Sequence, residues 1–148
     1  MKQVLVGVAA LTLMTSALAF EMASPDEAKA MSERAQAVVN EMGSEKAFEM
    51  FADPDGEFID RDLYVFCMDM EGVMLSHPLR PELVGQNLID FNRYGDLLFQ
   101  NMIAKAKESG SGWVDYNWTY PGTDEIREKT SYIATNDEEF FCGVGAYK

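Results

Sequence analysis

The side chains of this sequence that could carry out chemistry are few, and their spacing does not indicate catalysis. His77 is the only histidine, and the chain contains no Gly-x-Ser-x-Gly motif for an activated serine. Carboxylates are abundant, but none are spaced as a general acid–base pair. The acidic run from Asp53 to Asp62 resembles part of a calcium loop without its full spacing or terminal glutamate, so we interpret it as a solvated turn. An enzyme, for example a small hydrolase, is therefore disfavoured.

Other residues have the types and positions that suit binding of a small molecule. Alternate side chains of an extended segment share a face, so Tyr64 and Phe66 point the same way from one strand-like segment. Gly143 and Gly145 likewise share a face of the last segment. If these two segments are neighbours, glycines that face aromatic rings either leave a hollow for a small ligand or admit a packed helix.

Further candidates lie between these two segments. Tyr116 and Trp118 point the same way from a third segment, and each has a polar tip on an apolar body, which suits a small polar ligand. The alternative for Trp118 is a place in the core. His77, just before Pro78, can donate to a ligand or to a loop carbonyl. If His77 faces the ligand, affinity should change between about pH 5.5 and 7.5, where imidazole titrates.

The two cysteines, Cys67 and Cys142, each lie in a strand-like segment. Two cysteines in an exported protein usually pair, so we predict a disulfide that joins the first long strand to the last; the alternative is two free thiols. Closing a loop of roughly 75 residues contributes on the order of 4 kcal/mol in the chain-entropy description. With one histidine the cysteines cannot complete a four-ligand zinc site without carboxylates, so we predict no metal and no cofactor.

The elements that position these residues follow from caps and periodicity. Ser24-Pro25-Asp26-Glu27 combines an N-cap, a first-turn proline and a capping box, and apolar residues then recur at steps of three and four until Gly43. We predict a shorter second helix from Ser44 to about Phe51 and a third over residues 92–108. Predicted strands cover residues 63–68, 73–75, 113–118, 129–135 and 140–147. This order predicts an α+β domain with a five-stranded, mostly antiparallel sheet behind N-terminal helices.

The start of the chain predicts export. Lys2 is followed by an apolar run from Val4 to Ala19 that ends in Ala-Leu-Ala, the pattern of a secretory signal peptide over residues 1–19. The alternative, an uncleaved anchor, would need roughly 20 apolar residues, and this run is shorter. We expect a mature protein of residues 20–148, a single domain in the periplasm or outside the cell.

The charge of the chain limits its partners. Twelve basic and 25 acidic residues give a formal net charge of −13, which repels phosphate backbones and anionic lipid surfaces. Nucleic-acid binding is therefore disfavoured. An anionic ligand would need a local group of cations, for which Lys129 is the first candidate and Arg80, Arg93 and Arg127 are alternatives. A lysine at the start of a strand is otherwise simply solvated.

Five motifs in order resemble a known family. They are Asp62-Leu63-Tyr64-Val65-Phe66 with Asp69-x-x-Gly72 and His77-Pro78, then Leu83-Val84-Gly85-Gln86-Asn87-Leu88, Gly112-Trp113-Val114-Asp115-Tyr116-x-Trp118-x-x-Pro121, Lys129-x-x-Tyr132, and Gly143-Val144-Gly145-Ala146-Tyr147. Together they resemble the single Cache domain of the second type, an extracellular sensor module of chemoreceptors and histidine kinases. The resemblance extends from about Ser24 to Tyr147.

This resemblance implies a PAS-like sheet with a pocket on one face and a small ligand, often a short carboxylate such as acetate, propionate, lactate or pyruvate. It marks Lys129 as the cation for a carboxylate. The ligand-binding residues that we predict are Tyr64, Phe66, His77, Tyr116, Trp118, Lys129, Tyr132 and Gly145. Better-known members carry membrane helices and an output domain, which this sequence lacks. We therefore expect a stand-alone periplasmic binding module, or alternatively an accessory protein that docks on a membrane receptor or histidine kinase.

Overall fold

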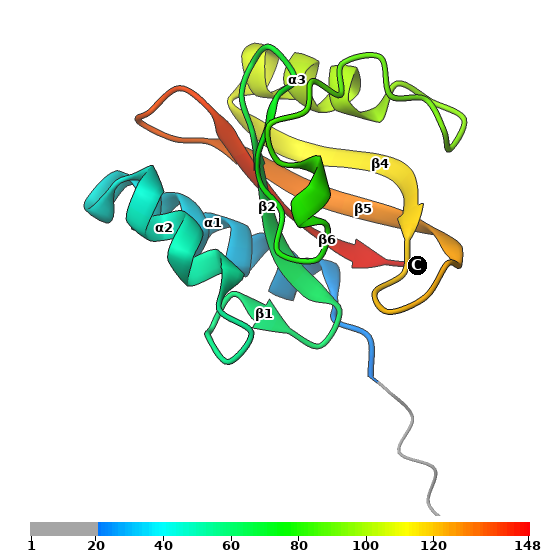
Figure 1. Ribbon diagram of the computed structural model, residues 1–148, viewed down its shortest axis with the longest axis horizontal. Coiled ribbons are helices and arrows are strands. Elements are labelled where there is room, and N and C mark those ends of the chain that lie inside the picture. Colours follow the sequence, from blue (N-terminus) through cyan, green and yellow to red (C-terminus); the bar gives the residue numbers. More distant parts are fainter. Residues whose placement is uncertain (1–20) are drawn as a thin grey trace, which may run out of the picture.

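The computed structural model describes residues 21–148, which form an antiparallel sheet with helices on both faces (Figure 1). Helices α1 (Pro25–Met42) and α2 (Ser44–Ala52) pack on one face, and α3 (Leu98–Ser109) packs on the other with the segment that precedes it. The predicted signal peptide, residues 1–19, lies outside the described residues. Within residues 21–148 no helix is both long enough and apolar enough to span a membrane.

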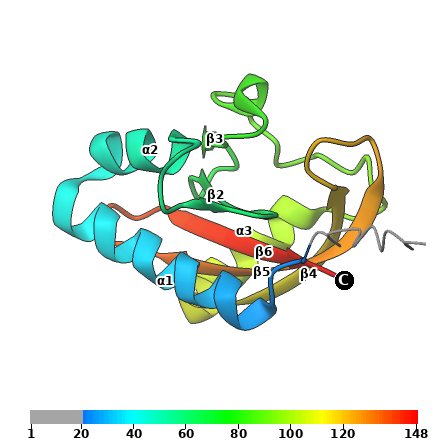
Figure 2. The same cartoon turned by 90° about the horizontal axis from the view of Figure 1, so that it is seen from below.

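The sheet of the described chain has six strands, one more than the sequence predicts. They are β1 (Ile59–Asp60), β2 (Leu63–Met68), β3 (Met74–Ser76), β4 (Ser111–Thr119), β5 (Ile126–Thr135) and β6 (Phe141–Tyr147). Their order is β1-β2-β6-β5-β4 with β3 paired to β2, so the last strand lies inside the sheet (Figure 2). The additional strand β1 has two residues, too few to produce a periodic signal. The predicted α+β, PAS-like class is confirmed.

The N-terminal helix begins where the capping signals place it. The Ser24 side chain accepts from the Glu27 backbone N–H at 3.3 Å, and the Ser24 backbone N–H donates to the Glu27 carboxylate at 2.8 Å. The buried stripe of α1, which includes Ala28, Met31 and Ala35, then packs against the sheet. Helix α3 begins at Leu98 rather than Asn92. A turn with Gly95 at φ 103° occupies the intervening residues, and that conformation is incompatible with a helix.

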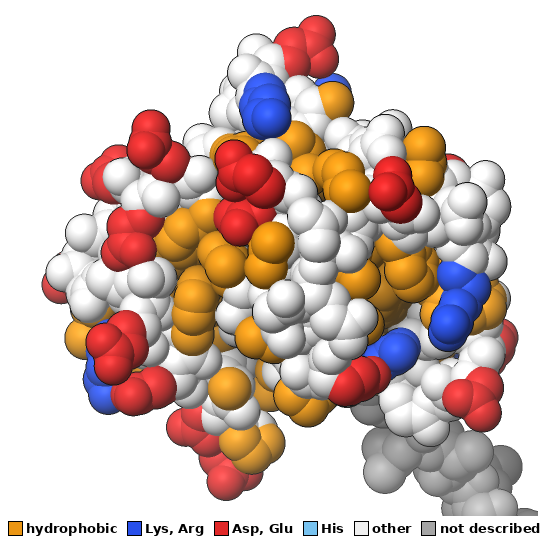
Figure 3. Space-filling model, turned by 45° about the horizontal axis from the view of Figure 1, so that its top comes forward, with side chains coloured by type: hydrophobic (Ala, Val, Ile, Leu, Met, Phe, Trp, Pro, Cys, Tyr) orange, Lys and Arg blue, Asp and Glu red, His pale blue; other side chains and the backbone are white. Residues whose placement is uncertain are grey.

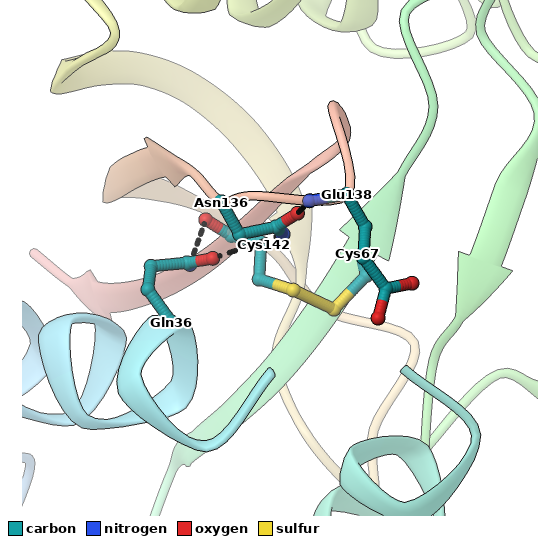
Figure 4. The surroundings of a disulfide bond; sticks show 5 residues. All are labelled: Gln36, Cys67, Asn136, Glu138 and Cys142. Atoms are coloured by element: carbon teal, nitrogen blue, oxygen red, sulfur yellow. Dashed lines mark hydrogen bonds between the residues drawn. A yellow bond between two sulfur atoms is a disulfide. The ribbon is translucent and has the colours of Figure 1, made fainter. Parts of the chain in front are cut away.

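The predicted disulfide between Cys67 and Cys142 is confirmed. The two residues lie directly opposite each other on β2 and β6, and both are fully buried beneath α1. Gln36 of α1 donates to the Cys142 carbonyl at 3.3 Å and accepts from the Asn136 side chain at 3.2 Å (Figure 4). The disulfide therefore joins β2 and β6 on the face covered by α1, and it does not occupy the opposite face of these strands.

Removing this bridge should lower the free energy of unfolding by roughly 2–5 kcal/mol, because the unfolded chain regains the freedom of a long loop. The cysteines are 75 residues apart in sequence. The measurement is urea unfolding of the Cys67→Ala/Cys142→Ala variant beside the wild type, each with and without reductant. Reductant should lower the midpoint of the wild type only. Equal sensitivity of both proteins would contradict a stabilising disulfide.

Candidate ligand-binding site

The face of the sheet opposite α1 carries most of the predicted binding residues. Tyr64 and Phe66 of β2 point to this face, and Phe66 lies opposite Gly143 of β6. The space above the glycines is filled by side chains, so the predicted hollow is not at this point. A Cβ on Gly143 would lie 2.7 Å from the Phe66 ring, and one on Gly145 would collide with the Lys129 side chain. Gly145 therefore makes room for Lys129 and does not face a cavity.

A small inner cavity brings together five of the predicted residues. It has a volume of about 10 Å³ and is bounded by Tyr64, Phe66, His77, Tyr116 and Trp118, with Met74 and Phe99 completing its wall. A space of this size holds about one water molecule. The residues on this face thus form a nearly closed aromatic box.

A larger outer cavity of about 460 Å³ adjoins the box. Its walls come from the segment after β3 with Arg80, from Arg93 and Tyr94, and from the turn between β4 and β5 at residues 119–124. Tyr64, His77 and Trp118 line both cavities, so they form the partition between them. Sequence alone does not predict that the turn at 119–124 borders a cavity, because its Pro-Gly pair indicates only a change of direction.

Lys129 reaches this partition from the other side. Its side chain extends from β5 across Gly145 of β6, and its Nζ donates to the Tyr64 hydroxyl at 2.9 Å. The ammonium also lies 4.1 Å from the centre of the Tyr64 ring and 4.7 Å from that of Tyr147. Lys129 is 1% exposed, and no carboxylate of residues 21–148 forms an ion pair with it. The protein thus holds a buried cation whose partner is a neutral phenol.

Burial changes the titration of the two basic groups at the partition. Desolvation lowers the pKa of Lys129 to about 7, although the charge of Asp62 opposes this change. Desolvation also lowers the pKa of His77 to about 3, and the charges of Lys129 and Arg80 add to the effect. The neutral His77 accepts the Arg80 backbone N–H on Nδ1 at 3.0 Å, which leaves its Nε2–H to donate. The expected titration of His77 between about pH 5.5 and 7.5 is therefore wrong.

Tyr116 and Tyr132, which both belong to the predicted set, lie on opposite faces of the sheet. The Tyr116 hydroxyl lies 2.8 Å from Ser131 Oγ, on the same face as Lys129. Tyr132 lies on the opposite face, where its hydroxyl donates to Ser111 and Lys29 of α1 lies 5.0 Å from its ring centre. Residues three apart on a strand point to opposite faces, so the Lys-x-x-Tyr spacing itself separates Tyr132 from Lys129. Tyr132 is not part of this site.

The charges around the two cavities are unlike those of the rest of the protein. On the face shown in Figure 3 acidic side chains are scattered widely and basic ones are few, in keeping with the net charge of −13. Two arginines, Arg80 and Arg93, nevertheless line the outer cavity, and Lys129 lies behind Tyr64. Asp124 is the one carboxylate among the lining residues of that cavity. Arg80 is ion-paired with Glu82, whereas no carboxylate of residues 21–148 forms an ion pair with Arg93 or Lys129, so these two cations are the groups that favour an anion.

An antiparallel sheet with N-terminal helices on one face and a cavity on the other defines the class of PAS-like sensor domains. Within that class, the chain matches the family described as Single Cache domain 2 over residues 2–148, and it belongs to this family. Domains of this family are sensory ligand-binding modules that lie outside the cytoplasm.

Two curated proteins resemble parts of the chain. The methyl-accepting chemotaxis protein McpP of Pseudomonas putida is 37% identical over 75 residues, which are 50% of this chain and 14% of that protein. The sensor histidine kinase MctS of Rhizobium johnstonii is 33% identical over 89 residues, 59% of this chain and 19% of that protein. The chain thus matches less than a fifth of the length of either relative.

A solved structure described as the structural basis for carboxylic acid recognition by a Cache chemosensory domain is also similar. It has a TM-score of 0.66 and 27% sequence identity, over 82% of this chain and 86% of that one. A methyl-accepting chemotaxis protein from Vibrio parahaemolyticus has a TM-score of 0.70 at 21% identity, over 82% and 86% of the two chains, and this likeness concerns the fold alone.

Replacing Lys129 by methionine should stabilise the ligand-free protein at about pH 6 by on the order of 2 kcal/mol, because relief of the buried charge exceeds the loss of the Tyr64 hydrogen bond. The folded pKa of about 7 lies below the ordinary 10.5. The destabilisation caused by the buried Lys129 ammonium is therefore complete below pH 7. It decreases as pH rises from 7 towards 10.5, because in this range Lys129 keeps its proton only in the unfolded state.

Urea unfolding of Lys129→Met and the wild type across this pH range measures both effects. The wild type should gain stability with rising pH relative to the variant. The exposed Lys107 provides the control, since Lys107→Met should keep the wild-type pH dependence. A constant difference between Lys129→Met and the wild type at every pH would show that the ammonium is not buried as described.

Proposed function

We propose that this protein is an exported, non-enzymatic sensor module that binds a short-chain carboxylate at the partition between its two cavities. One observation carries the proposal. Lys129 is a buried ammonium whose only hydrogen-bond partner among residues 21–148 is the Tyr64 hydroxyl. A buried cation without an anion is unfavourable, and a bound carboxylate would supply the missing charge.

The neutral groups near Lys129 suit the same ligand. Tyr64 and Tyr116 are buried, which raises the pKa of each hydroxyl and keeps it a donor. His77 is neutral and has its Nε2–H free to donate, since Nδ1 already accepts the Arg80 N–H. A carboxylate oxygen accepts from all such groups, whereas a cationic ligand would meet Lys129 and the arginines.

The size of the cavities limits the rest of the ligand. The inner box holds about one water, so the carboxylate sits in the outer cavity against the partition, or the partition opens to admit it. Only in the second arrangement do the aromatic walls around Phe66 and Trp118 surround the ligand and limit it to a short apolar tail. That arrangement supports an acid of two or three carbons, whereas the outer cavity of about 460 Å³ has room for a larger acid. The solved Cache domain whose description names carboxylic acid recognition supports the same class.

The place of the protein in a signalling system follows from two lines of support. The charged start and apolar run of residues 2–19 support export to the periplasm or beyond. Both curated relatives, a chemoreceptor and a histidine kinase, contain the matching segment within much longer chains. A second candidate function is therefore that of an accessory protein that reports its occupancy to such a membrane receptor or kinase.

A thermal-shift experiment with acetate, propionate, lactate and pyruvate tests the proposal. An acid at 100 times its dissociation constant should stabilise the protein by about 2.7 kcal/mol, because it binds only the folded state. Lys129→Met should abolish the shift, and Lys107→Met should retain it. Propionamide, which has the shape of propionate without its charge, serves as the matched ligand control. A shift of equal size with propionamide, or in Lys129→Met, would refute a carboxylate site at Lys129.

The affinity for propionate should be constant from about pH 5.5 to 6.5 and should weaken above about pH 7, by at most tenfold per pH unit. Free Lys129 loses its proton near pH 7, so binding above that pH must take up one proton. Calorimetry in buffers of different ionisation enthalpy measures this uptake. His77 predicts no change in the acidic range, because its pKa is about 3. Affinity that rises below pH 6.5 with a midpoint typical of imidazole would contradict this assignment.

A further inference from the structure

The outer cavity is larger than an acid of two or three carbons requires. Its volume is about 460 Å³. This value lies within the range of roughly 300–1,000 Å³ that is typical of small-molecule sites. A carboxylate placed against the partition from the outer side would therefore leave most of this cavity for the rest of the ligand. The side chains on the cavity walls determine which chemical groups that part of the ligand can carry.

Three charged side chains line the outer cavity, namely Arg80, Arg93 and Asp124. Arg80 is already ion-paired with Glu82 of its own segment. Neither Arg93 nor Asp124 forms an ion pair with another of the residues 21–148. Arg93 is therefore the cation on these walls that is available to an anionic group of a ligand.

The turn that carries Arg93 is packed against the partition. Phe91 and Tyr94, on either side of Arg93 in the sequence, lie on Trp118 with ring centres 5.7 and 5.5 Å away. The rings of Phe91 and Tyr94 also contact each other, with their centres 5.4 Å apart. Trp118 is one of the residues that line both cavities. This aromatic cluster holds the backbone at Arg93 beside the partition, although the Arg93 side chain itself is exposed.

Lys129 supplies a second cation next to the same cavity. Its ammonium lies 2.9 Å from the Tyr64 hydroxyl, and Tyr64 lines the outer cavity. Like Arg93, Lys129 has no ion pair within residues 21–148. One of the two cations thus lies behind Tyr64 and the other lies in the wall formed by the turn after Phe91. An acid with a single carboxylate would engage only one of them.

We propose that Arg93 binds a second carboxylate of the ligand, so that the protein takes a dicarboxylate that extends from the partition into the outer cavity. This inference rests on the proposed function, because it adds a contact to the ligand that Lys129 holds. The planar guanidinium presents paired N–H donors that match the geometry of a carboxylate. Asp124 lies in the same cavity and repels an anion there, so the gain in affinity from Arg93 is modest.

Calorimetric titration with succinate and succinamate tests this inference. The two compounds form a matched pair, because succinamate has an amide in place of one carboxylate. The protein should bind succinate roughly 3- to 10-fold more tightly than succinamate, of which about twofold is statistical. The difference should shrink in about 0.5 M sodium chloride, because salt screens charges at an exposed side chain. The same comparison of malonate and glutarate with their half-amides allows for a shorter or longer span between the two cations.

Variants of Arg93 separate its charge from a structural role. Arg93→Gln should lower the affinity for succinate to that for succinamate and leave the affinity for propionate unchanged. Arg93→Lys keeps the charge and should retain part of the preference for succinate. Arg34 is exposed on α1, on the other face of the sheet, so Arg34→Gln should keep every wild-type affinity. An equal loss of propionate and succinate binding in Arg93→Gln would overturn the inference.

The outcomes distinguish this inference from the proposed function. If propionate binds but none of the three dicarboxylates binds more tightly than its half-amide, the second contact is refuted and the proposed function stands. If succinate is preferred and Arg93→Gln does not change this preference, Arg93 is not the contact. A protein that binds neither propionate nor any of the dicarboxylates would refute the proposed function together with this inference.

Discussion

The ammonium of Lys129, held inside the protein against the Tyr64 hydroxyl, constrains which strands can lie beside one another in this sheet. To reach Tyr64, the lysine must cross the central strand β6, and only the missing side chain of Gly145 allows it to pass. Strands β5, β6 and β2 must therefore be adjacent and in this register. The buried position of Lys129 thus requires both this strand order and a glycine at position 145.

The two faces of the sheet differ in the side chains that they bury. The face beneath α1 and α2 contains a continuous apolar cluster with the disulfide in it, and few polar groups are buried there: Gln36 is hydrogen-bonded to Cys142 and Asn136, and the Ser32 hydroxyl has no partner among the described residues. The opposite face contains an aromatic cluster interrupted by Lys129, Ser131 and His77, which are polar and buried. Such groups cost stability wherever they are incompletely paired. Lys129, Ser131 and His77 thus distinguish this face from the one beneath α1.

Sequence reasoning succeeded where a short repeat decides the outcome. The alternation of strand residues placed Tyr64 with Phe66 and Tyr116 with Trp118, and the predicted pairing of Cys67 with Cys142 is confirmed on adjacent strands. Sequence reasoning does not predict the environment of a residue that depends on contacts between segments far apart in the chain. Nothing local indicates that Asp62 is buried against the backbone of Ala23 or that Gly145 accommodates a lysine. Tyr132 lies three residues after Lys129, so strand alternation alone already directs it to the opposite face.

The disulfide has a consequence for where the protein can become functional. It joins β2 to β6, the strands that carry Tyr64 and Gly145, and so it fixes the span that the Lys129 side chain must bridge. Thiols are kept reduced in the cytosol and are oxidised outside it. Formation of this bridge therefore requires an oxidising environment, and the oxidation that secures the fold also fixes the spacing of the strands that carry Tyr64 and Gly145.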